Sequence, residues 1–175
     1  MQIEKYHLGI RILHWVMAFV IIGLVIVGFL MADLLPRNYA HLGDLYYFHK
    51  SFGVLVLILV ILRIAIRELS KIPDFPAQVS KFEAKIAKLV HYSFYIIMIC
   101  MPISGYLMSN FAGRGVAFFG FNLPNIVEKN TVGRELMSEI HEIGAYVVIV
   151  LLTMHVAGVI KHKIKDKVSL LDRMI

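Results

Sequence analysis

Charged side chains are scarce in this chain of 175 residues, at 17% of the sequence, while 59% of the residues are apolar. A soluble domain carries about a quarter charged residues. The mean hydropathy is +0.75, and the charged residues gather between long apolar runs. The low charge content and the high mean hydropathy exclude an ordinary soluble domain.

Cysteine is almost absent, because the chain has only Cys100. A lone cysteine cannot form an intrachain disulfide, so a disulfide-stapled fold is excluded and the redox compartment is left open. Cys100 lies inside an apolar run, where we expect it to be a small buried hydrophobic residue.

What the chain has instead is four apolar runs, at about 12–32, 46–66, 86–109 and 140–160. A helix needs about 20 apolar residues to cross a bilayer, and each run is long enough. The first run is too long for the apolar region of a signal peptide and no clear cleavage site follows it, so we expect it to be retained. The sequence therefore predicts an all-α membrane protein, a four-transmembrane-helix bundle that forms one domain over residues 1–175.

The net charge of +6 is distributed unevenly along this topology. If the N-terminus is cytoplasmic, thirteen Lys and Arg residues lie inside and five outside, whereas the acidic residues divide six and six. This asymmetry of cations predicts that both termini are cytoplasmic. The basic stretch 161–167 is then expected to meet anionic lipid headgroups. No aromatic platform accompanies the charges, so we expect no nucleic-acid partner.

Eight histidines are many for such a chain, since ionisable groups within a membrane are costly and commonly functional. Five of them fall within the predicted spans or at their ends, namely His14, His49, His91, His141 and His155. His141 and His155 are fourteen residues apart, which puts them on one helix face about 21 Å apart along the axis. By depth, His14 matches His155 near the inner surface and His49 matches His141 near the outer one.

Two histidine pairs at two depths predict two haem groups, because haem iron accepts an imidazole on each axial face and facing helices can supply one each. Small residues lie three or four positions from each ligand and would leave room for a porphyrin. They are Ala18, Gly53, Gly144 and Gly158. Zinc or copper is an alternative, although no carboxylate or thiol completes a four-coordinate site. A histidine proton pathway is another, but it would not need the small neighbours.

Two arginines are candidates for the haem propionates. Arg63 is fourteen residues after His49 and so lies on the same helix face at the inner level. Arg11 reaches the same level from the first span. Arg67 is better explained by a side chain that extends to the lipid headgroups.

The sequence around these residues resembles the bacterial cytochrome b561 family of dihaem cytochromes b. The matching segments are Arg11-Ile12-Leu13-His14-Trp15, His49-Lys50-Ser51-Phe52-Gly53 with Arg63 and Arg67, the set His91, Tyr95, Pro102 and Gly105, the loop 115–120 with Leu123-Pro124, the pair His141 and His155, and Arg173-Met174. The resemblance covers most of the chain.

This resemblance implies two haem b groups, the inner one held by His14 and His155 and the outer one by His49 and His141. Small stand-alone members of the family resemble superoxide oxidase, which oxidises superoxide outside the bacterial inner membrane and reduces ubiquinone. By position, His162 would contact the quinone. Positive charge attracts an anion such as superoxide, and Lys50 and Arg114 are the outer candidates.

A second function stays open at this point. Related dihaem subunits anchor hydrogenases and formate dehydrogenases, so the chain could instead relay electrons to a redox partner protein. A haem-free transporter or scaffold is a third class. His91 has no free iron in the predicted scheme, and we expect it to be structural or adjacent to the quinone.

Overall fold

The computed structural model describes residues 4–175, and within them the apolar runs form four α-helices. They are α1 (Leu8–Phe29), α2 (Leu42–Glu68), α3 (Lys81–Phe111) and α4 (Thr131–Ile164). A five-residue π-helix, η1 (Leu30–Leu34), extends α1, and a short 3-10 helix, η2 (Leu171–Arg173), lies near the C-terminus. The predicted class, a four-helix membrane protein, is confirmed.

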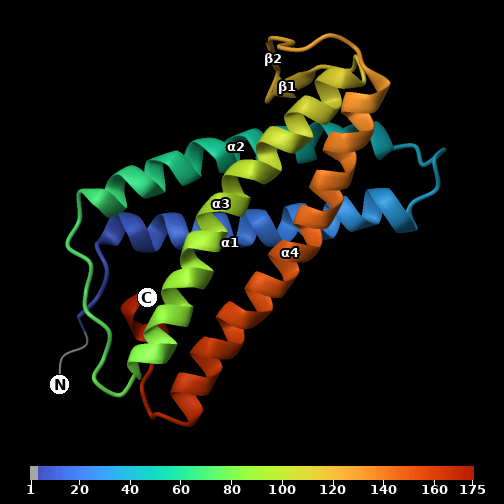
Figure 1. Cartoon of the computed structure of the whole chain (residues 1–175). Coiled ribbons are helices and arrows are strands. Elements are labelled where there is room, and N and C mark those ends of the chain that lie inside the picture. The colour runs from blue at the N-terminus through green and yellow to red at the C-terminus, as the bar shows by residue number, and fades with distance from the viewer. Residues whose placement is uncertain (1–3) are drawn as a thin grey trace.

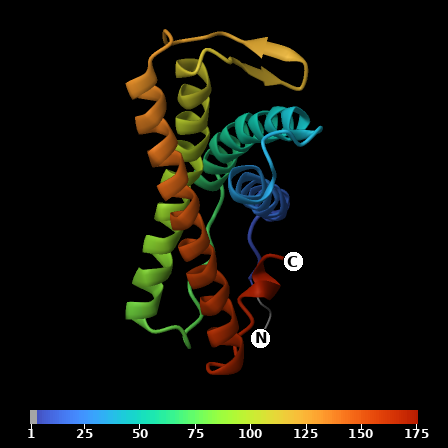
Figure 2. The same cartoon turned by 90° about the vertical axis from the view of Figure 1, so that its right-hand side faces the viewer.

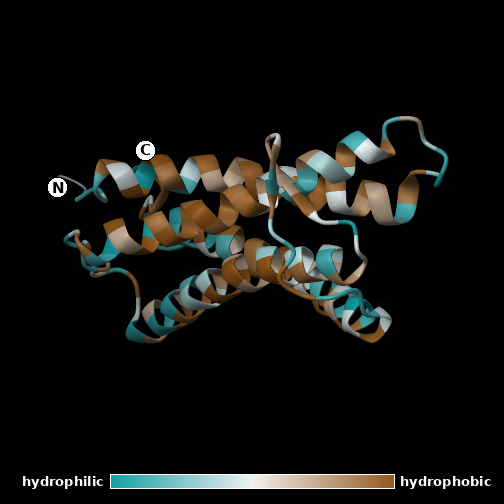
Figure 3. Cartoon of the chain, turned by 90° about the horizontal axis from the view of Figure 1, so that it is seen from above, coloured by the Kyte–Doolittle hydropathy of each residue, from teal (hydrophilic) through white to brown (hydrophobic). Residues whose placement is uncertain are grey.

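The faces of these helices suit a lipid environment. All four are long and apolar enough to cross a membrane, and most of each apolar stretch lies on the molecular surface. Phe19, Ile61, Ile96 and Val150 are among the exposed large side chains. Figure 3 shows hydrophobic residues along the middle of the helices and hydrophilic ones gathered toward their ends. Cys100 also lies on this exposed surface, so the expectation that it is buried was wrong.

The helices form two antiparallel pairs that cross one another. α1 packs beside α2, and α3 packs along α4, while α2 and α3 join the two pairs (Figures 1 and 2). Met17 of α1 with Val56 and Val60 of α2 form the buried core, against which Tyr95 and Met98 of α3 pack. α1 and α4 are not in extensive contact, and this leaves space between them.

A β-hairpin closes the end of the bundle opposite the termini (Figure 1). Its strands β1 (Val116–Phe118) and β2 (Phe121–Leu123) pair antiparallel around Phe119 and Gly120, both at positive φ, as a two-residue hairpin turn requires. The fully buried Ser51 of α2 donates to the Ala117 carbonyl at 3.0 Å and accepts from the Phe119 N–H. α2 thus fixes the hairpin over the bundle end.

The segment after α4 folds back beside the start of α1, at the end of the bundle opposite the β-hairpin. The Trp15 indole N–H donates to the Met174 carbonyl at 2.9 Å, and the Tyr6 N–H donates to the Arg173 carbonyl. Arg173 is buried, donates to the carbonyls of Glu4 and Asp74, and lies over the Tyr6 ring. The two ends of the chain therefore lie together at one end of the molecule (Figure 2).

Candidate functional site

The four histidines predicted as ligands form two pairs in the structure. The rings of His14 on α1 and His155 on α4 have centroids 6.1 Å apart. Those of His49 on α2 and His141 on α4 are 6.2 Å apart. Each pair joins one helix of the α1–α2 pair to α4, and the fourteen residues between His141 and His155 separate the two levels by about 21 Å.

Both separations fit two imidazoles on one metal ion. An imidazole nitrogen lies about 2 Å from a bound metal, so two axial imidazoles place their ring centroids about 6 Å apart. The rings are inclined at 59° and 71° to one another, which rotation about the axial bonds allows. The residues present therefore suit a bis-histidine haem at each level.

His141 is held in the tautomer that metal binding requires. Its Nδ1 lies 3.1 Å from the Met101 carbonyl oxygen and 3.1 Å from the Ser104 hydroxyl oxygen. The carbonyl can only accept, so Nδ1 carries the proton, and Nε2 keeps its lone pair for a metal. Partners of this kind orient a ligating histidine and raise its basicity. Neither partner was predicted from the sequence, because both depend on how α3 packs against α4.

His14 on α1 and His49 on α2 differ from His141 in their hydrogen bonds. Nδ1 of His49 is buried and has no hydrogen-bond partner among the described residues. For His14, a guanidinium nitrogen of Arg63 lies 3.4 Å from Nδ1, while another donates to the Ile10 carbonyl at 3.1 Å. Within residues 4–175, neither histidine therefore has a hydrogen-bond acceptor that fixes its tautomer as the Met101 carbonyl fixes that of His141.

A cavity of about 540 Å³ surrounds the inner histidine pair, between α1 and α4. This volume is typical of cofactor pockets, which occupy about 300–1,000 Å³. Space also remains beside Gly53 and Gly158, where an added Cβ would meet nothing within 4 Å. Gly144 differs from expectation, because a Cβ there would come within 2.3 Å of the Met101 sulfur. Gly144 thus permits the close approach of α3 and α4.

The arginines occupy different places around this cavity. Arg63 and Arg67 both line it, so Arg67, predicted to extend to the headgroups, faces the same space as Arg63. Arg11 is not among the lining residues, and its Nε is buried without a partner among residues 4–175. Two guanidinium groups are therefore available to the propionates of a group bound at the inner level.

His91, expected to be structural or adjacent to the quinone, lies beside His155. Its ring lies 5.5 Å from that of His155, centroid to centroid, and it also lines the inner cavity. The His91–His155 separation of 5.5 Å is shorter than the about 6 Å that suits two imidazoles on one metal ion, whereas the His14–His155 separation of 6.1 Å matches it. A planar macrocycle therefore fits better between His14 and His155.

A polar cluster lies at the inner end of the same cavity. His162 is buried, and its Nδ1 lies 2.6 Å from a carboxylate oxygen of Asp166. The Lys161 ammonium lies 2.5 Å from Asp166 and also pairs with Glu83 of α3. Hydrogen bonds from Lys161 first, and then from His162, hold the pKa of Asp166 below its usual value. Glu83 and Asp166 were not singled out from the sequence, because they are far apart along the chain.

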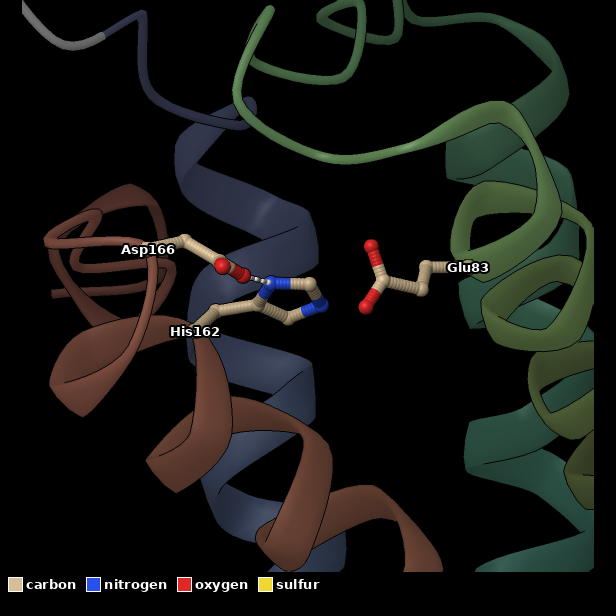
Figure 4. A group of neighbouring side chains, drawn as sticks. All are labelled: Glu83, His162 and Asp166. Atoms are coloured by element: carbon tan, nitrogen blue, oxygen red, sulfur yellow. Dashed lines mark hydrogen bonds and ion pairs between the residues drawn. The ribbon is translucent and has the colours of Figure 1, made fainter.

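The cluster contains residue types that commonly bind metal ions, but the Lys161 side chain already supplies a cation to its two carboxylates. Glu83, His162 and Asp166 offer ligand atoms within 4.8 Å of one another. Figure 4 shows the second ring nitrogen of His162 directed toward Glu83. Because the Lys161 ammonium already contacts both carboxylates, we assign no metal ion to these residues.

A smaller cavity of about 430 Å³ lies under the β-hairpin and is lined by Lys50 and Arg114. The Lys50 ammonium donates to the Ser109 hydroxyl at 2.7 Å and to the Gly115 carbonyl at 3.2 Å. Lys50 directly follows His49 in the sequence. Both cations named from the sequence therefore line one cavity.

Comparison with known proteins agrees with this geometry. The model of the prokaryotic cytochrome b561 family matches residues 5–175. Cytochrome b561 homolog 2 of Escherichia coli (strain K12) is 28% identical over 98% of this chain and 92% of its own length. Cytochrome b561 homolog 1 of the same organism is 27% identical over 73% of this chain and 72% of its own length. The chain is a membrane electron-transfer protein that belongs to the prokaryotic cytochrome b561 family, whose members carry b-type haem.

Proposed function

We propose that this chain is a dihaem cytochrome b of the bacterial inner membrane that passes electrons from the outer face to a quinone near the inner face. The observation that carries the proposal is the pair of imidazole couples at 6.1 and 6.2 Å on two levels of α4. His14 and His155 would hold the inner haem, and His49 and His141 the outer one. When bound, these haems supply one-electron transfer along the membrane normal.

Residues around the two histidine pairs orient the imidazole rings and supply charge. Met101 and Ser104 keep the proton of His141 on Nδ1, which orients the ring. At the inner level, Arg63 and Arg67 provide positive charge beside the cavity. Arg63 donates to the Ile10 carbonyl at 3.1 Å and contacts His14 only weakly, at 3.4 Å, so part of its guanidinium could still pair with a propionate.

Superoxide is the electron donor that this proposal favours at the outer face. It is a small anion that gives one electron, and the cavity under the β-hairpin is lined by Lys50, which follows His49 in the sequence, and by Arg114. Positive potential in a cleft concentrates anions and raises their association rate. Lys50 is fixed by Ser109 and Gly115, so its charge is held in place at the cavity wall.

Quinone is the acceptor proposed at the inner face. The buried His162 lines the inner cavity together with Tyr6, Arg63 and Arg67. A quinone carbonyl needs a hydrogen-bond donor and, once reduced, a proton. His162 can supply both at the wall of the cavity that contains the inner histidine pair.

Superoxide addition to the purified, oxidised protein tests this function. We expect a reduced b-type absorption band to appear and then to decay when a soluble ubiquinone is added. Lys50→Gln should slow the first phase and weaken its dependence on salt, whereas Lys50→Arg should leave it near the original rate. A protein that binds haem but ignores superoxide, and that purifies with a stoichiometric soluble subunit, would favour the anchor and electron-relay function instead.

A further inference from the structure

The cluster of Glu83, Lys161, His162 and Asp166 is not explained by haem binding. It joins the start of α3 to the end of α4 at the inner mouth of the cavity. Quinone reduction consumes two protons for every two electrons, so a quinone in this cavity needs a neighbouring group that can supply protons. Resting on the proposed function, we propose that this cluster supplies protons to the quinone through His162, with Asp166 as the residue that positions it.

The exposed fraction of the four side chains increases from His162 through Asp166 to Lys161 and Glu83. The side chain of His162 is 9% exposed, and that of Asp166 is 16% exposed. Those of Lys161 and Glu83 are 33% and 31% exposed. The series therefore runs from a buried imidazole on the cavity wall to polar groups in contact with water at the end of the bundle.

Asp166 determines which nitrogen of His162 exchanges protons. A carboxylate only accepts hydrogen bonds, so the 2.6 Å contact keeps the proton on Nδ1. Nε2 is then the nitrogen that gains and loses a proton, and Figure 4 shows it directed toward Glu83, away from Asp166. The pKa of Asp166 is held below its usual value by Lys161 and His162, so this acceptor stays ionised near neutral pH.

The four side chains of the cluster carry charges of both signs. Glu83 and Asp166 bring two negative charges and Lys161 brings one positive charge. A proton held by His162 as an imidazolium would make the four side chains neutral. The other titratable or charged groups that line the cavity are Tyr6, His14, Arg63, Arg67, His91, His155 and Arg173.

The proposed step balances as follows. As a quinone takes an electron, the Nε2–H bond of His162 breaks and an O–H bond forms on the quinone. Water from the inner side, ordered by Glu83 and Lys161, then returns a proton to Nε2. Two such cycles convert a quinone, two electrons and two protons into a quinol, and the electrons come from the one-electron donor at the outer face.

The test compares Asp166→Asn and Glu83→Gln with two neutralised acids at the same end of the chain, Asp74→Asn and Glu68→Gln. Both control side chains are exposed, and neither residue lines the cavity. Pre-reduced protein of normal haem content is mixed with a short-chain ubiquinone, and the decay of the reduced band is followed. A positioned proton donor commonly contributes a factor of about 100 or more. We expect Asp166→Asn and Glu83→Gln to slow this decay at least tenfold, with both controls unchanged.

A second measurement tests directly whether Asp166 positions the His162 ring, without turnover of quinone. In protein labelled with 15N-histidine, Asp166→Asn should increase the Nε2–H tautomer of His162, and Asp166→Glu should restore the original spectrum. An unchanged His162 signal, or variants that reduce quinone as fast as the original chain, would overturn the proton pathway and leave the proposed function intact. If the original chain itself fails to reduce ubiquinone, the proposed function fails instead.

Discussion

Ser104 and the Met101 carbonyl both hold Nδ1 of His141, and they illustrate what single residues add to a ligand set. The spacing of His141 and His155 and their depths were sufficient to predict which histidines pair. The tautomer was not predictable, because it depends on a carbonyl and a hydroxyl of another helix. Hydropathy carries no information about such contacts.

Removal of the Ser104 hydroxyl should weaken the outer haem site. Partners that orient a ligating histidine are commonly worth 10–100-fold in metal affinity. Since the Met101 carbonyl remains in Ser104→Ala, we expect outer haem affinity to fall about tenfold, with no change at the inner site. Haem titration of each level by difference spectroscopy measures this, and Ser93→Ala on the same helix is the control. Equal loss at both levels would point to a general folding defect.

The contribution of Asp166 to the stability of the folded protein should depend on pH. Its pKa lies below the ordinary 3.8 in the folded protein, chiefly because Lys161 donates to it. The contribution of a carboxylate with a lowered pKa is complete above pH 3.8 and is lost as the pH falls through the lower folded value. Thermal unfolding of the original chain and of Asp166→Asn should therefore differ by a constant amount between pH 5 and 7. The two curves should converge below pH 4, and a difference that grows on acidification would contradict this assignment.

At the scale of helices, the sequence predicted the spans well but not the contacts between them. The apolar runs gave the number and order of the helices, since a bilayer demands about 20 apolar residues for each. The helices extend beyond those runs, because polar first and last turns such as the Ser80–Glu83 capping box continue them into the headgroup region. The β-hairpin was not predicted, since three-residue strands give too short an alternation to recognise.

Glycines on α3 and α4 show why the contacts were missed. Gly144 was expected to make room for a cofactor, but it accommodates Met101. Gly105, noted only as part of a resemblance, lies against the ring of His141, where an added Cβ would be 3.1 Å from Cε1. A small residue in a sequence indicates that something approaches closely, but it does not distinguish a helix from a ligand.

Gly105→Val should displace the His141 ring and reduce the outer haem content. The first added carbon already meets the ring at 3.1 Å, and the two methyl groups of valine would crowd it further. We expect most of the outer haem to be lost and the inner haem to remain, as measured by haem extraction and spectra. Gly23→Val on α1, where nothing lies within 4 Å of an added Cβ, is the matched control. Full outer haem in Gly105→Val would show that α3 does not constrain His141.

For the whole molecule, both ends of the described chain lie at one end of the bundle and the β-hairpin at the other (Figure 1). This arrangement agrees with an even number of spans, while the side on which the ends lie stays a prediction from the charge asymmetry. With thirteen of the eighteen Lys and Arg residues at the end that carries the termini, that end should be cytoplasmic.

Thiol labelling of intact cells tests this orientation. In a Cys100→Ser background, a membrane-impermeant reagent that crosses only the outer membrane should label Lys129→Cys. The same reagent should label Lys167→Cys only after the inner membrane is opened. The reverse pattern would place the proposed quinone end outside and would remove the rationale for superoxide at Lys50.

The haem-to-protein ratio, read with a reduced-minus-oxidised spectrum, tests the central claim most directly. We expect two haem b per chain, with one remaining in His141→Ala and one, spectrally distinct, in His155→Ala. His91→Ala should retain two, since His91 has no iron in this arrangement. A single haem in the original chain, the loss of neither haem in a ligand variant, or the loss of one in His91→Ala would contradict the two-level pairing of His14 with His155 and of His49 with His141.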